Sequence, residues 1–181
     1  ALRDALVFAS GKMQHIAGGP TLAYEIPSNV VNIGKGRVPI NLVFFNLGTF
    51  RPDQEYHRTC YLPVLRGTPQ HKLADMRNVF DFNNPVLTAG QRNVTTVPTQ
   101  SLFLMNSPLV KKHAKSIAER IESEADEESR RLELLWLYVL NRPATNKEKA
   151  RAAEFLTQSG EQAWSELAHA LIASNEFLMR F

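Results

Sequence analysis

Apolar residues recur with the spacing of an α-helix through most of the chain after Asn106. Ser107-Pro108 is a typical helix start, because a serine hydroxyl can accept a hydrogen bond from a free amide and proline has no amide to satisfy. The buried stripe expected for the helix that follows holds Val110, Ala114, Ile117, Ala118 and Ile121. Two further helical stripes lie in residues 132–140 and 164–172. Three such stripes joined by short connections predict an antiparallel helical bundle.

The later helices of this bundle have recognisable boundaries. Residues 132–140 are apolar on almost every side, which predicts a helix covered by its neighbours. Asn141-Arg142-Pro143 ends that helix, and Thr145-Asn146-Lys147-Glu148 has the pattern of a capping box that begins the next one. We expect a single bundle core that contains Trp136, Leu140, Trp164, Leu167, Leu171 and Phe177.

The first part of the chain has a different character. A short helical stripe at residues 2–9 stops at Ser10-Gly11, and its early register suggests a domain excised from the C-terminus of a larger protein. Glycine and proline interrupt residues 12–66 repeatedly, and both residue types break helices. The runs between these breaks have strand character, namely 29–33, 40–47 and 59–65.

Two shorter helices are expected before the bundle, one over residues 71–80 and one from Pro98 to Met105. The signals together predict a mainly α fold, in which a C-terminal helical bundle follows a loop-rich N-terminal part with a few short strands. We expect residues 1–181 to form one domain, with the loop-rich part at 1–106 and the bundle at 107–181.

Composition narrows the class of protein. Hydrophobic residues make up 44% and charged residues 22%, which is typical of a globular chain and not of a disordered one. The net charge is +3 with no run of Lys or Arg longer than two residues, so we expect no nucleic-acid partner. No stretch approaches the roughly 20 apolar residues of a membrane span, and the apolar-looking residues 40–45, which Asn41 interrupts, are far too short.

No pattern in the sequence names a reaction. Gly34-Lys35-Gly36 begins like a nucleotide-binding loop, but the rest of that motif is missing. If the run around Cys60 is extended, His57 and Cys60 point to opposite faces, so we expect Cys60 to be a core residue and not a nucleophile. The other histidines show no ligand spacing, and we expect neither a metal nor a cofactor in this chain.

An unusual set of polar side chains lies in the irregular segment before the bundle. The guanidinium group of arginine matches carboxylate and phosphate oxygens, which favours a site for an anion or a sugar. Packed loops also leave backbone groups that need hydrogen-bond partners, and we favour this structural interpretation. The candidate ligand-binding residues are Arg58, Arg66, Asp81, Arg92, Thr95, Gln100 and Asn106.

Residues 58–66, 80–85 and 92–106 carry the patterns R-x-x-x-x-P-x-x-R, F-D-x-x-x-P and R-x-x-T-T-x-P-x-Q-x-L-x-L-x-N. These runs resemble a domain of unknown function at the C-terminus of large planctomycete and verrucomicrobial proteins. The resemblance continues in residues 2–11, in Gly18-Gly19-Pro20, in 141–145 and in 173–177, which is similar to the family's N-S-N-E-F. Residues 21–55 carry none of it, and His57 stands where the family often has a second arginine.

The resemblance implies an exported protein, periplasmic or at the cell surface, in which this domain follows others. Those proteins often include a cytochrome c-like domain, so any haem would belong to a separate upstream domain. Two functions remain open. The first is a non-catalytic structural and interaction domain whose partners are the preceding domains of the same polypeptide. The alternative is a domain that binds or degrades polysaccharide.

Overall fold

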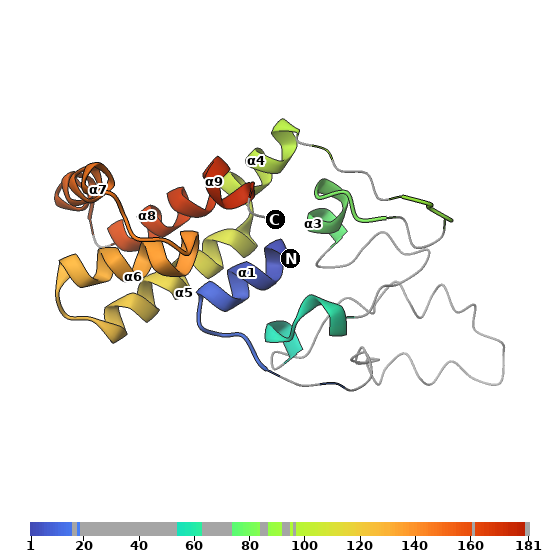
Figure 1. Ribbon diagram of the computed structural model, residues 1–181, viewed down its shortest axis with the longest axis horizontal. Coiled ribbons are helices and arrows are strands. Elements are labelled where there is room, and N and C mark those ends of the chain that lie inside the picture. The colour runs from blue at the N-terminus through green and yellow to red at the C-terminus, as the bar shows by residue number, and fades with distance from the viewer. Residues whose placement is uncertain are drawn as a thin grey trace, which may run out of the picture. The chain divides into compact units, whose positions relative to one another are not determined.

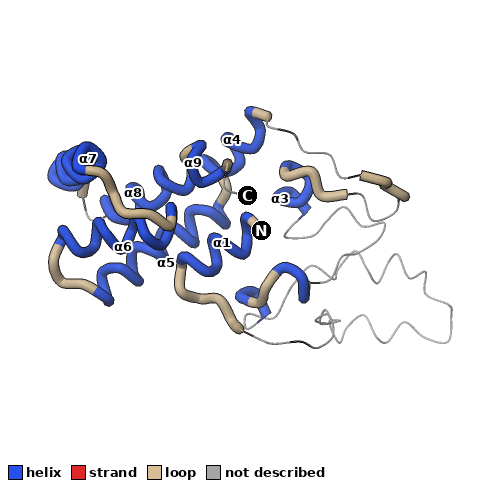
Figure 2. Tube along the Cα trace, in the orientation of Figure 1, coloured by secondary structure: helices blue, strands red, loops and turns tan. Residues whose placement is uncertain are grey.

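The computed structural model describes residues 1–15, 18, 54–62, 74–83, 87–91, 95, 97–160 and 162–179. This part of the chain is mainly α-helical, as the sequence predicts (Figure 2). Over these residues it contains no strand, only an isolated bridge between Gln14 and His57. The predicted strands at 29–33 and 40–47 lie outside the described residues.

The chain divides into two compact units, which are described separately here. One unit consists of Ala1–Met13 and Ser101–Phe181, and the other of Gln14–Gln100. The first helix, α1 (Leu2–Ala9), therefore belongs to the same unit as the C-terminal helices. The division at residue 106 stays a prediction.

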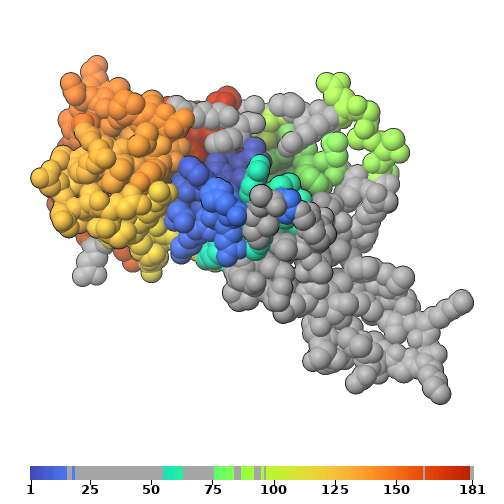
Figure 3. All heavy atoms as spheres, turned by 60° about the horizontal axis from the view of Figure 1, so that its bottom comes forward, coloured from blue at the N-terminus to red at the C-terminus, as the bar shows by residue number. Residues whose placement is uncertain are grey.

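The later helices are α4 (Pro98–Asn106), α5 (Pro108–Glu124), α6 (Glu128–Leu140), α7 (Asn146–Gln158), α8 (Ala163–Ile172) and α9 (Asn175–Leu178). The helical unit is built on α5 and α8, which pack along each other (Figure 1). Helix α6 packs against both of them, α1 lies against α5 and α6, and α7 contacts α8. The space-filling view shows α1 in blue directly beside this bundle (Figure 3). None of the helices in the described residues is long and apolar enough to cross a membrane.

The bundle core follows the predicted stripes in most respects. Its fully buried side chains include Leu6, Leu104, Ile117, Ile121, Leu135, Leu140, Ile172 and Phe177. Trp136 and Leu167 are also buried, as expected, but Trp164 and Leu171 are only half-buried. Each of these two stands one residue from an end of the ten-residue helix α8, where neighbouring helices cover it less.

The helix boundaries confirm one predicted cap and correct another. Thr145 accepts a hydrogen bond from the backbone amide of Glu148, and the Glu148 carboxylate accepts one from the Thr145 amide, as a capping box requires. Ser107 does stand at the N-cap of α5 with Pro108 next to it. Its side chain makes no capping hydrogen bond, so the predicted role of the hydroxyl is wrong.

The junction between α1 and α5 explains the Ser-Gly pair that ends the first helix. The last four carbonyl groups of a helix have no partner within it. Arg120 of α5 supplies one, because its guanidinium donates to the last two carbonyl oxygens of α1 at 3.3 and 3.0 Å. Ser10 donates to the carbonyl oxygen of Val7 at 2.8 Å and lies 3.2 Å from Nδ1 of His113 on α5.

The junction needs a glycine at position 11 for two reasons, its backbone conformation and the closeness of Arg120. The φ of Gly11 is +71°, in the left-handed region that side chains disfavour, and an added Cβ would lie 2.9 Å from Cδ of Arg120. We expect Gly11→Ala to lower the free energy of unfolding by about 1–2 kcal/mol, measured by urea denaturation. Gly160→Ala is the matched control, since nothing lies within 4 Å of its added Cβ. Equal stability of the two variants would contradict this account of the junction.

In the second unit, two predictions around Cys60 are wrong in the described residues. Residues 59–61, predicted to be part of a strand, form a 3-10 turn, Thr59–Tyr61. Cys60 is exposed, although the sequence favoured a core position, because the turn directs its side chain outward. His57 is the buried residue here. The predicted helix at 71–80 is present as α3 (Ala74–Val79) within the described residues, and Pro98 does begin α4.

Candidate functional site

Three of the candidate ligand-binding residues come together in the second unit. Asp81 follows the end of α3 by two residues and has a left-handed backbone, with a φ of 53°. The Asp81 carboxylate accepts hydrogen bonds from the amide and the hydroxyl of Thr95, both at 2.7 Å. Gln100, the third member, is buried at the start of α4. We call Asp81, Thr95 and Gln100 the loop clasp.

Gln100 closes the loop clasp through its side-chain amide. Nε2 donates to the carbonyl oxygen of Thr95 at 3.0 Å and to that of Val79 at 3.2 Å. The second of these carbonyls belongs to the last turn of α3, where helix carbonyls need outside partners. The clasp therefore fixes the end of α3, residue 95 and the start of α4 together. This arrangement supports the structural interpretation of these three residues.

The remaining candidates do not join the clasp in the described residues. Arg58 is exposed, and no hydrogen bond or ion pair of its side chain is present in this part of the chain. Asn106 donates to the carbonyl oxygen of Leu102 one turn earlier in α4, which is a local contact. Arg66 and Arg92 lie outside the described residues. A common anion site for the whole set stays a prediction.

A serine and a histidine meet between α1 and α5, but their geometry is structural. Ser10 and His113 are both buried, at 4% and 2% exposure. The Ser10 hydroxyl donates its proton to the Val7 carbonyl oxygen, so it is not donated to the histidine as in an activated nucleophile. The pair instead fastens α1 to α5. No three His, Cys, Asp or Glu side chains within the described residues gather closely enough to hold a metal ion.

Arg142 forms two-point contacts with two carboxylates of the helical unit. Its guanidinium binds Glu148 through Nη1 and Nη2 at 2.9 and 2.6 Å. It also binds Glu176 through Nε and Nη2 at 2.7 and 2.6 Å. Two-point contacts of this kind are the stronger form of an arginine–carboxylate pair. Arg142 thereby ties the start of α7 and the short helix α9 to the end of α6, and we call these three residues the arginine clamp.

The arginine clamp changes the acidity of its members. The hydrogen bonds from Arg142 hold the pKa of Glu148 well below its usual range, and burial opposes this only in part. The hydrogen bonds from Glu176 and Glu148 raise the pKa of Arg142 further. The indole of Trp136 faces Glu148 and adds a small lowering, but its buried N–H makes no hydrogen bond of normal geometry. Arg142 and Glu148 are therefore both charged at neutral pH.

A second cluster of polar contacts surrounds the guanidinium of Arg120, and we call Arg120, Glu124 and Tyr138 the Arg120 brace. Nε of Arg120 donates to Glu124 at 2.8 Å, and its Cζ lies 3.7 Å from the centre of the Tyr138 ring, a cation–π contact. Tyr138 donates a short hydrogen bond to the same carboxylate. The hydrogen bond from Tyr138, followed by that from Arg120, lowers the pKa of Glu124. The brace orients Arg120 so that it can cap α1.

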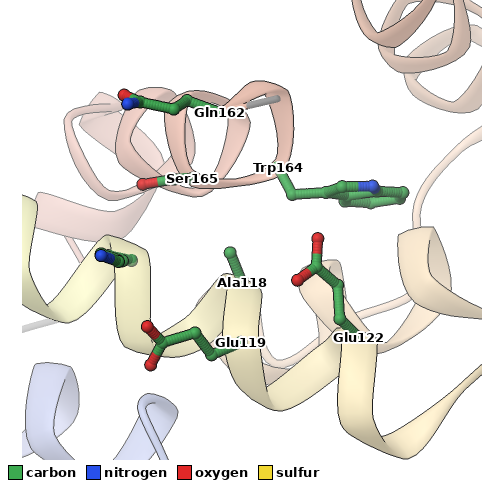
Figure 4. A pocket seen from close by; sticks show the side chains of 7 residues that line it. Ala118, Glu119, Glu122, Gln162, Trp164 and Ser165 are labelled. Atoms are coloured by element: carbon green, nitrogen blue, oxygen red, sulfur yellow. The ribbon is translucent and has the colours of Figure 1, made fainter. Parts of the chain in front are cut away.

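One pocket of the helical unit is lined by side chains that belong neither to the arginine clamp nor to the contacts around Arg120. It lies between α5 and α8, has a volume of about 210 Å³, and is open to solvent (Figure 4). Its lining residues are Lys115, Ala118, Glu119, Glu122, Gln162, Trp164 and Ser165. We call it the α5–α8 pocket. The figure shows Trp164 and Glu122 at one end, with the Glu122 carboxylate directed toward the indole.

The helical pattern of the sequence does not indicate this pocket. Trp164 follows the apolar stripe of α8 and was therefore expected in the core, while the glutamates of α5 have the pattern of a solvated face. One signal was available: Trp164 is flanked by Gln162 and Ser165, which are polar residues at the start of a helix. An indole in such surroundings is often only partly covered.

Residues 1–156 match the family described as PSD1, protein of unknown function (DUF1553). No curated protein and no solved structure matches the chain. The matched region covers the loop clasp, the α1–α5 junction and two members of the arginine clamp, Arg142 and Glu148. The match takes in most of the chain, which therefore belongs to this family of proteins of unknown function.

Proposed function

We propose that this chain is a non-catalytic structural and interaction domain. The observation that carries the proposal is that polar residues from five of the sequence patterns quoted above hold elements of the chain's own fold together. Catalytic groups, by contrast, must be reachable by a substrate and kept ready for proton transfer or attack. Residues tied up in buried or bidentate contacts do not meet that condition.

Five of the patterns, at residues 2–11, 80–85, 92–106, 141–145 and 173–177, make such contacts in the described residues. Ser10-Gly11 forms the α1–α5 junction, and the loop clasp uses Asp81, Thr95 and Gln100. The connection after α6 supplies Arg142 to the arginine clamp. The closing pattern at 173–177 supplies Ser174, which caps α9, and Glu176, which completes the clamp. These contacts support a structural role for these five patterns.

A surface for a partner is available on α4. Leu102 and Met105 are 55% and 54% exposed, and they lie three residues apart, which places them on one face of the helix. Large apolar side chains that are exposed together are typical of interaction surfaces. We propose that the partner is a preceding domain of the same exported polypeptide, in which any haem would be bound upstream. The resemblance supports this choice of partner.

The polypeptide region that precedes the chain can be produced separately and titrated with it by calorimetry. We expect binding, and we expect the double variant Leu102→Glu/Met105→Glu to weaken it at least about tenfold, because hot-spot residues dominate interface energies. Leu137→Glu is the matched control, since Leu137 is 47% exposed but lies on α6. Unchanged binding by the double variant, or turnover of a substrate by the chain alone, would refute the proposal.

A further inference from the structure

Trp164 differs in burial from Trp136, the other tryptophan of the chain. It is only half-buried, whereas Trp136 is 3% exposed in the core. The open part of the indole lies in the α5–α8 pocket (Figure 4). An indole presents a flat apolar face together with an N–H donor, so it suits a ligand that is apolar on one side and polar on its edge.

The polar side chains around Trp164 offer both donors and acceptors. Lys115 can only donate, Glu119 and Glu122 can only accept while ionised, and Gln162 and Ser165 can do both. No hydrogen bond or ion pair of these five side chains is present in the part of the chain that the structure describes. Other glutamates of the same unit, such as Glu124, Glu133 and Glu148, are paired. The lining side chains of the pocket are thus available to a ligand.

The charges of the pocket select between classes of ligand. Two carboxylates against one ammonium group give the lining a net charge of −1, which disfavours phosphate, sulfate and carboxylate groups. A simple cation would be attracted to Glu122 and the indole face, but it would be opposed by Lys115 and would leave Gln162 without a role. A ring that carries hydroxyl groups on its edge and C–H groups on its faces uses every part of the lining.

We propose that the α5–α8 pocket binds one ring of an uncharged saccharide, stacked on Trp164. Its volume of about 210 Å³ is below the usual range for a whole small-molecule ligand, about 300–1,000 Å³, and it is open to solvent. The rest of a saccharide chain would therefore extend into solvent. This binding activity goes beyond the proposed interaction domain and does not depend on it, because α4 contributes no residue to the pocket.

The test uses the chain with three neutral probes, the hexasaccharides of β-1,4-linked glucose, mannose and N-acetylglucosamine. Glucose serves as the single-ring probe, a heparin hexasaccharide as the anionic probe, and N-acetyl-argininamide as the cationic probe. Binding is followed by the NMR signals of the two indole N–H groups. We expect at least one neutral hexasaccharide to shift the Trp164 signal and to leave that of the buried Trp136 in place.

Variants separate stacking from charge. Trp164→Ala should weaken binding at least about tenfold, in keeping with the weight of tryptophan in binding sites, while Trp164→Phe should retain part of it. Phe155→Ala, an exposed aromatic residue on α7, is the control and should change nothing. Glu122→Gln should alter affinity by less than about threefold, since an amide still hydrogen-bonds to hydroxyl groups.

Three results would overturn the inference. The first is that no neutral hexasaccharide binds at 10 mM. The second is a stronger response to heparin or to N-acetyl-argininamide than to every neutral sugar. The third is binding that survives in a folded Trp164→Ala variant, with folding checked by circular dichroism. None of these results would affect the α4 surface, whose test uses a different partner and different variants.

Discussion

Phe177→Ala is expected to lower the free energy of unfolding by about 3–5 kcal/mol, which is the usual cost of removing a buried aromatic ring. Phe177 is 1% exposed and is among the largest fully buried side chains in the described residues. It lies in α9, which contacts both α6 and α8, so the loss of its ring leaves a cavity where three helices meet. The measurement is urea denaturation followed by circular dichroism.

Met179→Ala is the matched control for this prediction. Met179 follows Phe177 by two residues, but it is 68% exposed. Its truncation should change stability by no more than about 0.5 kcal/mol, as is usual for surface positions. If the two variants unfolded at the same urea concentration, α9 would not be part of the bundle core.

Arg142→Ala is expected to lower the free energy of unfolding at pH 7 by about 1–3 kcal/mol, because it leaves two partly buried carboxylates without their charged partner. The range is modest because all three members of the arginine clamp are about a third exposed. Arg151→Ala on α7 is the control, since Arg151 is exposed and makes no ion pair in the described part of the chain.

The effect of Arg142→Ala should also depend on pH. The clamp lowers the pKa of Glu148 in the folded state, so its contribution is fully present above the unfolded pKa of glutamate, about 4.3. It is lost progressively as the pH falls from there toward the lowered folded value. The stability gap between the native chain and the variant should therefore be constant above about pH 5.5 and narrow below about pH 4. A gap that is the same at pH 3 and pH 7 would exclude this charge-dependent role.

Local signals in the sequence predicted the helices well. The capping box at Thr145 and Glu148 and the proline that begins α4 were identified because each depends on residues close together in the chain. The contacts that Arg142 and Arg120 make between helices cannot be predicted in this way. Arg142 and Glu176 are 34 residues apart, and Arg120 contacts carbonyl groups more than 100 residues earlier. Such pairs depend on how the helices pack, which periodicity alone does not specify.

In the candidate site, too, the sequence indicates which residues are distinctive but not which groups they contact. Asp81, Thr95 and Gln100 were recognised as polar residues in irregular backbone, but which groups they bind depends on the left-handed turn at Asp81. Cys60 is exposed and not in the core, because the chain makes a 3-10 turn where the sequence predicts an extended run. Trp164 was assigned to the core because helical spacing identifies a face and does not report that a pocket opens on it.

A double-mutant cycle between Arg142 and Glu176 tests most directly whether the polar residues of the quoted sequence patterns stabilise the fold. The two residues come from separate patterns, one after α6 and one in α9, and they meet only in the folded chain. Urea denaturation of Arg142→Ala, Glu176→Ala and the double variant gives their coupling free energy. A structural role predicts a favourable coupling of about 1–2 kcal/mol, within the range for residues in direct contact. Additive effects, with a coupling near zero, would contradict it.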